Sequence, residues 1–129
     1  MELTQEPKES KNFIRNYENG VIYIGKSSYK YNILLTNNSI EKWGINKIEN
    51  LSLKDLSSPL KLSPEIIIIG TGAKVFVPKK EIVDKIYQQG IGLEYMITDS
   101  ACKTFNILLA EERKVVAVSY THLTLPTKA

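Results

Sequence analysis

The chain has 129 residues and a mass of 14.6 kDa, the size of one domain that is large enough to bury a hydrophobic core. Its hydrophobic content of 43% and its charged content of 24% are those of a globular protein. The net charge of +3 comes from basic residues scattered among acidic ones, so the clustered basic surface of a nucleic-acid-binding protein is not expected.

The single cysteine, Cys102, excludes an intrachain disulfide and a multi-cysteine zinc site. The first residues are polar and lack the apolar core of a secretory signal. Apolar runs such as residues 66–69 are far shorter than the roughly 20 residues that a membrane-spanning helix needs. These features predict a cytoplasmic protein without a membrane span.

The N-terminal half has the pattern of short strands separated by turns, after a loose lead-in over residues 1–12. Asn19 and Gly20 are typical of a hairpin turn because both residue types tolerate positive φ. We predict an antiparallel β layer with strands over residues 13–17, 21–24, 29–36 and 40–43. A short helix capped by Ser52 should follow, limited by Pro59 and Pro64.

The C-terminal half alternates strands with helices. Residues 65–69 are apolar at consecutive positions, which is typical of a central strand covered on both faces. A helix opened by Pro78, a strand over 93–97, a helix from Thr98 or Asp99 to about 111, and a strand over 115–118 complete the pattern. This alternation predicts an α/β fold with a parallel or mixed sheet and right-handed crossovers.

Residues 119–129 share no period with the rest and have no partner segment. We therefore predict a single α/β domain over residues 1–118 and a non-native tail over 119–129.

Several strings of residues together resemble a small domain family. They are GTG at 70–72, EYMIT at 94–98, ACKTFNIL at 101–108 and AEERKV at 110–115, with NILL at 32–35 and Trp43 upstream. The family includes the third assembly factor of mitochondrial respiratory complex I and an adipogenesis-associated cytosolic protein, and many of its bacterial and archaeal members have no assigned function. The resemblance covers about residues 13–118.

This resemblance implies a central mixed sheet with packed helices and an additional β layer from the N-terminal half. It implies no established catalytic residues. Lys103 and Phe105 depart from the arginine and tyrosine that the family often has there, which removes a guanidinium suited to bidentate anion binding.

A candidate cleft lies where the first buried strand ends and the later helix begins. Gly70–Gly72 follow the strand at the edge where ligands of open α/β sheets bind, but they match neither GxGxxG nor a P-loop, and a tight turn is the alternative. The helix start can bind an anion or activate a thiol, whereas Cys102 can equally be a small buried residue. The candidate cleft comprises Gly70, Thr71, Gly72, Thr98, Asp99, Cys102, Lys103 and Asn106.

A candidate interface lies in the aromatic N-terminal half, at Tyr29, Tyr31 and Trp43, for which the alternative is an ordinary core position. We expect a non-enzymatic interaction or assembly module whose partner is a protein, with respiratory-complex subunits implied by the resemblance and self-association left open. The alternative is a small-molecule or anion-binding protein, or a weak enzyme, that uses the cleft. We predict no catalytic residue, metal or cofactor.

Overall fold

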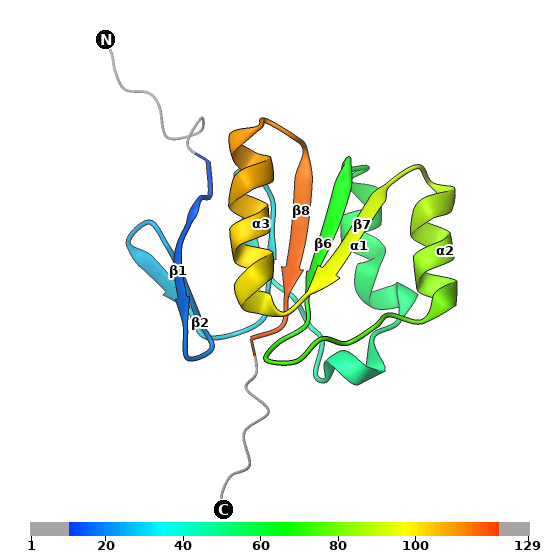
Figure 1. Cartoon of the computed structure of the whole chain (residues 1–129), viewed down its shortest axis with the longest axis horizontal. Coiled ribbons are helices and arrows are strands. Elements are labelled where there is room, and N and C mark those ends of the chain that lie inside the picture. The colour runs from blue at the N-terminus through cyan, green and yellow to red at the C-terminus, as the bar shows by residue number, and fades with distance from the viewer. Residues whose placement is uncertain (1–10, 122–129) are drawn as a thin grey trace, which may run out of the picture.

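The computed structural model describes residues 11–121 and contains two β-sheets flanked by helices (Figure 1). The smaller, antiparallel sheet consists of β1 (Ile14–Glu18), β2 (Val21–Ile24) and β3 (Ser27–Tyr29). The larger sheet has the strand order β5-β4-β8-β6-β7. Its strands are β4 (Ile33–Leu35), β5 (Ile40–Lys42), β6 (Ile66–Gly70), β7 (Gly92–Met96) and β8 (Val115–Ser119).

Three α-helices and two short 3-10 helices complete the described residues. They are η2 (Ile48–Asn50), η3 (Leu53–Leu56), α1 (Ser57–Lys61), α2 (Lys80–Gln88) and α3 (Thr98–Ala110). In the large sheet β6 lies between β7 and β8 and is parallel to both, whereas β4 is antiparallel to β8 and β5. The predicted central mixed sheet with packed helices and an extra antiparallel layer is therefore confirmed.

Both faces of the large sheet are covered, which explains why its central strands are continuously apolar. Side chains of Ile67 and Val116, which are paired in register, point to the face covered by α1 and α2. Side chains of Ile68 and Ala117 point to the opposite face, where α3 and the three-stranded sheet pack. Figure 1 shows α3 beside β8, with β1 on the other side of the helix.

The predicted strand over residues 29–36 is wrong as a single element, because the chain leaves one sheet and enters the other between β3 and β4. Asn32 holds this crossing in place. Its buried side chain donates to the Ile45 carbonyl at 2.9 Å and accepts the Thr121 N–H at 2.8 Å. Those bonds stabilise a break in strand structure that strand propensity alone does not predict.

Two element boundaries also differ from the predictions. Pro59 lies inside α1 instead of limiting the helix, because a proline in the first turn blocks no helical hydrogen bond. At the other end β8 runs to Ser119, and Tyr120 and Thr121 beyond it are buried. Ordered structure therefore continues past residue 118, while residues 122–129 of the predicted tail and 1–10 of the predicted lead-in lie outside the described residues.

The core beneath α3 provides a direct test of this packing. Phe105 is fully buried on α3, so Phe105→Ala should lower the free energy of unfolding by about 3 to 5 kcal/mol through lost burial and a residual cavity. Ile107 lies on the same helix and is 59% exposed, so Ile107→Ala should change the free energy of unfolding by about 0.5 kcal/mol or less. Urea unfolding followed by circular dichroism measures both, and similar losses in the two variants would contradict the packing described.

Candidate functional site

Four of the predicted cleft residues meet in a buried junction between β6, α3 and β8. Gly72 N–H donates to the Thr98 hydroxyl at 2.8 Å, and that hydroxyl donates to the Tyr120 carbonyl at 2.6 Å. The Thr98 N–H in turn donates to the Gly72 carbonyl at 3.0 Å. The Thr98 hydroxyl therefore uses its proton and a lone pair within the chain, and the side chain is fully buried.

Gly70 and Thr71 belong to the same junction. A Cβ on Gly70 would lie 3.0 Å from the Thr98 hydroxyl oxygen, so only glycine allows β6 and α3 to approach this closely. The Thr71 hydroxyl donates to the Lys74 carbonyl at 2.7 Å, and the Thr71 N–H donates to the Met96 carbonyl at 2.8 Å. These polar groups bind one another, which favours the interpretation of Gly70–Gly72 as a tight turn.

The other four predicted cleft residues lie farther along α3, facing β1. Asp99, Cys102, Lys103 and Asn106 line a groove of about 150 Å³ together with residues 14–17 of β1. On its exposed side Lys103 Nζ lies 3.3 Å from Asp99 Oδ2, in an i,i+4 ion pair. The structure thus divides the predicted cleft into a closed junction and a shallow groove.

Asn106 joins α3 to β1 through two hydrogen bonds. Its Oδ1 accepts the Ile14 N–H at 2.8 Å, and its Nδ2 donates to the Ile14 carbonyl at 2.8 Å. The side-chain amide therefore pairs with both backbone groups of one residue, as a neighbouring strand would. It fastens the three-stranded sheet to the helix.

The Cys102 thiol is poorly suited to nucleophilic chemistry. Burial, reinforced by the negative charge of Asp99, raises its pKa from 9.0 to about 12. The pKa of the neighbouring Tyr17 hydroxyl is also raised, first by burial and then by Cys102 and Asp99. The N-terminus of a helix can lower a thiol pKa, but here burial has the larger effect, because Cys102 is only 5% exposed.

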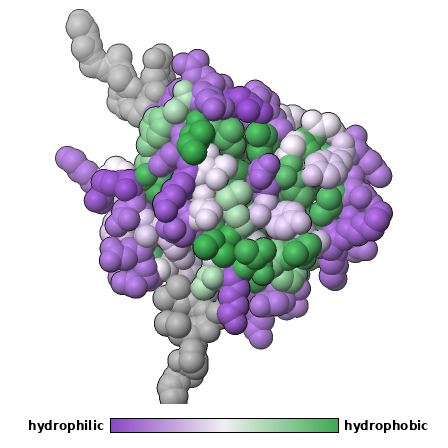
Figure 2. All heavy atoms as spheres, viewed as in Figure 1, coloured by the Kyte–Doolittle hydropathy of each residue, from purple (hydrophilic) through white to green (hydrophobic). Residues whose placement is uncertain are grey.

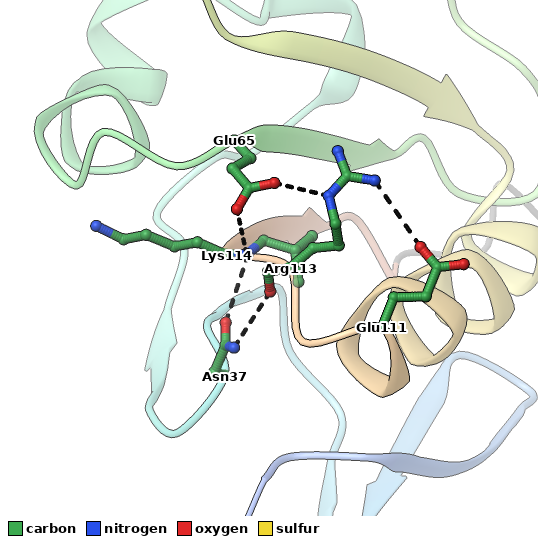
Figure 3. Close-up of polar contacts among 6 residues, drawn as sticks. Asn37, Glu65, Glu111, Arg113 and Lys114 are labelled. Carbon is green, nitrogen blue, oxygen red and sulfur yellow. Dashed lines mark hydrogen bonds and ion pairs between the residues drawn. The ribbon is translucent and has the colours of Figure 1, made fainter.

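A second polar cluster lies at the opposite end of the sheet, where α3 leads into β8 (Figure 3). Arg113 Nε lies 2.6 Å from Glu65 Oε1, and its Nη1 lies 3.8 Å from Glu111. The bond from Arg113, together with the Lys114 N–H, lowers the pKa of Glu65. Asn37 donates to the Arg113 carbonyl at 3.3 Å, so the cluster joins segments far apart in sequence.

The sequence indicated part of this cluster. The neighbouring Glu111 and Arg113 suggest an ion pair, but the main partner, Glu65, is 48 residues away and carries no local signal. All three charged side chains are more than a third exposed, so the cluster contributes little to stability. A groove of about 280 Å³ adjoins it, lined by Leu62, Lys114, Val115, Val116 and the turn at residues 36–39.

The three predicted interface aromatics occupy different environments. Trp43 is buried, and its indole N–H donates to the Asp55 carbonyl at 2.8 Å. Tyr31 is 43% exposed, stacks edge-on against Tyr29 with ring centroids 6.0 Å apart, and carries Lys42 Nζ 4.9 Å from its ring centre. Trp43 therefore belongs to the core, while Tyr29 and Tyr31 form an aromatic pair at the surface.

Two comparisons at the sequence level relate this chain to known proteins. Residues 14–119 match a family described as "Protein of unknown function (DUF498/DUF598)". The "13 kDa major membrane protein" of Francisella tularensis is 31% identical over 120 residues, which cover 92% of this chain and 98% of that protein. The "NADH dehydrogenase [ubiquinone] 1 alpha subcomplex assembly factor 3" of Danio rerio is 32% identical over 81 residues, 61% of this chain.

Solved structures share the fold. A crystal structure of a Bordetella parapertussis protein has a TM-score of 0.82 at 26% identity and covers 88% of this chain and 98% of that one. A Bordetella pertussis protein described as a Mth938-like domain has a TM-score of 0.74 at 22% identity, covering 94% and 92%. The fold is therefore Mth938-like.

The chain spans less than half the length of the assembly factors it matches, 47% in the Danio rerio protein. Among residues 11–121, none of the helices has both the length and the apolar character needed to cross a bilayer.

The buried junction predicts a large effect from one hydroxyl. Thr98→Val preserves shape but leaves the Gly72 N–H and the Tyr120 carbonyl without this partner, which should cost about 2 to 4 kcal/mol of unfolding free energy. Thr104→Val is the matched control on α3, because the Thr104 hydroxyl bonds only the Met96 sulfur at 3.4 Å. Its cost should stay below about 1 kcal/mol. Equal losses by urea unfolding would refute the role assigned to Thr98.

The raised pKa of Cys102 predicts a stability that falls at high pH. The thiol ionises at a lower pH in the unfolded chain than in the folded chain. Its contribution to the free energy of unfolding should therefore decrease as pH rises from about 9 towards about 12. Urea midpoints measured between about pH 8 and about pH 10.5 should therefore fall more steeply for the native chain than for Cys102→Ala. Parallel slopes for the two proteins would contradict the burial of a neutral thiol.

Proposed function

Because this chain belongs to the DUF498/DUF598 family and is similar to proteins named "NADH dehydrogenase [ubiquinone] 1 alpha subcomplex assembly factor 3", we propose that it is a non-enzymatic docking module that helps a protein complex to assemble. The observation that carries the proposal is the sequence similarity to those assembly factors, which extends over 81 residues in the Danio rerio protein. Its partner is a protein, and subunits of a respiratory complex are the first candidates.

The state of the predicted cleft gives further support to docking over ligand chemistry. The hydroxyls of Thr71 and Thr98 are bonded within the chain, and the raised pKa of the Cys102 thiol leaves little thiolate near neutral pH. A site for a small molecule or anion would need such groups to point at the ligand. The remaining groove beside α3 is shallow, about 150 Å³.

Surface recognition can use the aromatic pair at the edge of the two sheets. Tyr31 is exposed and is held by Tyr29 and Lys42, so it is an ordered side chain with both apolar and polar character. We retain Tyr29 and Tyr31 as proposed contact residues. Trp43 would act only indirectly, because it is buried in the core on one face of the large sheet, whereas Tyr29 packs against the core on the other face.

The Francisella tularensis relative is named a membrane protein, which bears on the location proposed for this chain. We retain a cytoplasmic location as part of the proposal. A membrane would then be reached through the partner complex.

Affinity capture of the full chain from its native cell tests the proposed function. We expect a defined set of subunits in a fixed ratio, and we expect Cys102→Ala to recover the same set, because docking does not need the thiol. Sedimentation of the purified chain measures self-association separately. Recovery of no protein, together with copurification of a metabolite that Cys102→Ala loses, would overturn docking in favour of the cleft.

A further inference from the structure

The segment that follows the Gly70–Gly72 turn has the side-chain pattern of a strand, although it pairs with none. Phe76 packs against the core face shared with α2, and Pro78 is buried. Val75 and Val77 point outward and are 61% and 63% exposed. Alternation between a core-facing and an open side chain is the signature of an extended segment with one free face.

The backbone of this segment is also open. Within residues 11–121, the N–H and carbonyl groups of Val75, Phe76 and Val77 make no hydrogen bond. The segment connects β6 to α2 and belongs to neither sheet. Unpaired donors and acceptors on extended backbone are a template to which another strand can add.

Charge around the segment indicates what kind of strand would add. Lys74 and Lys79 flank it, are exposed, and form no ion pair within the described residues. Lys80 is held by Asp84 at 2.8 Å. With Glu81 as the acidic residue, residues 74–81 carry three lysines and one glutamate, 3 − 1 = +2.

A second copy of the chain fits this segment poorly. Pairing two such segments would bring Lys74 and Lys79 of one copy close to the same lysines of the other copy. Like charges at close range on paired strands are destabilising. An acidic strand would instead place carboxylates near the lysines and apolar side chains over Val75 and Val77. Figure 2 shows hydrophobic surface across the lower part of this face, where the segment between β6 and α2 runs in Figure 1.

We propose that residues 74–79 are a docking edge for an extended, acidic segment of a protein partner, which adds to residues 75–77 as a strand. This inference rests on the proposed docking function and names the chemistry of the partner. Main-chain hydrogen bonds provide affinity, while Val75, Val77 and the flanking lysines select a segment that alternates apolar and acidic residues.

Nuclear magnetic resonance of the full chain tests the docking edge with a defined probe. The probe is a capped hexapeptide of alternating valine and glutamate, and the control peptide alternates valine and lysine. We expect the acidic peptide to shift the amide signals of residues 75–77 at saturation. Hydrogen exchange should slow at least about tenfold for those amides, at alternate positions, that point to the added strand, because only these gain a hydrogen bond. The lysine peptide should do neither.

Charge and side-chain variants separate the proposed contacts. The double variant Lys74→Glu, Lys79→Glu should weaken the acidic peptide at least about fivefold. The double variant Lys26→Glu, Lys30→Glu, on exposed residues that flank β3, makes the same change in net charge and should leave binding unchanged. Val75→Thr with Val77→Thr keeps β-branched side chains but should also weaken binding, since it removes apolar contact.

Three results would overturn the docking edge. They are no binding of the acidic peptide, shifts that map to Tyr29 and Tyr31 instead of residues 75–77, and signals of residues 75–77 that change with protein concentration alone. The affinity-capture experiment distinguishes failure of the docking-edge proposal from failure of the proposed assembly function. If native subunits are recovered equally with Lys74→Glu, Lys79→Glu, the function stands without this edge; if the peptide binds but no subunit is recovered, the assembly role fails instead.

Discussion

The hydroxyl of Thr98 is the contact on which the arrangement of the large sheet depends. It accepts from Gly72 after β6 and donates to Tyr120 after β8, so one oxygen links the ends of two parallel strands to the first residue of α3. The absence of a side chain on Gly70 lets the helix come close enough for this link. A buried hydroxyl that bonds two backbone groups stabilises one arrangement of the strands and the helix. Any other arrangement would lose those hydrogen bonds and leave buried polar groups without them, which costs free energy.

The consequence for chemistry is that the edge of the sheet where α/β proteins often bind ligands is occupied by the protein's own backbone. The polar atoms that could have received a substrate are already bonded at Gly72, Met96 and Tyr120. The docking function proposed above would use the outer surface, with its exposed aromatic pair, its grooves and its open backbone.

Much of the fold could be predicted from the sequence, because the signals were local. Consecutive isoleucines at 66–69 predicted a central strand and the apolar run at 115–118 predicted a strand, and both are covered on two faces. The break at Asn32 could not be predicted, because its bonding partners Ile45 and Thr121 lie 13 and 89 residues away. For the same reason the ion pair between Glu65 and Arg113 had no signal in the sequence.

The sequence was enough to predict that the turn after β6 meets the start of α3. It was not enough to predict the burial and hydrogen bonding of the side chains there. Parallel strands bring Gly70–Gly72 and Thr98 to the same edge, as the alternation of strands and helices implies. Which way a hydroxyl or a thiol points depends on rotamers and on the neighbouring segment, which periodicity does not describe. The burial of Cys102 and Trp43 followed from packing between distant elements and had to be observed.

The amide of Asn106 has a consequence for what the small sheet can display. It binds the backbone N–H and carbonyl of Ile14, so these two hydrogen bonds make no demand on the side chain there, whereas the packing of that side chain against α3 does. Residues on the outer face of the small sheet, such as Arg15 and Tyr23, are equally unconstrained by the link. The two hydrogen bonds of one asparagine thus hold the small sheet without using any side chain that its outer face displays.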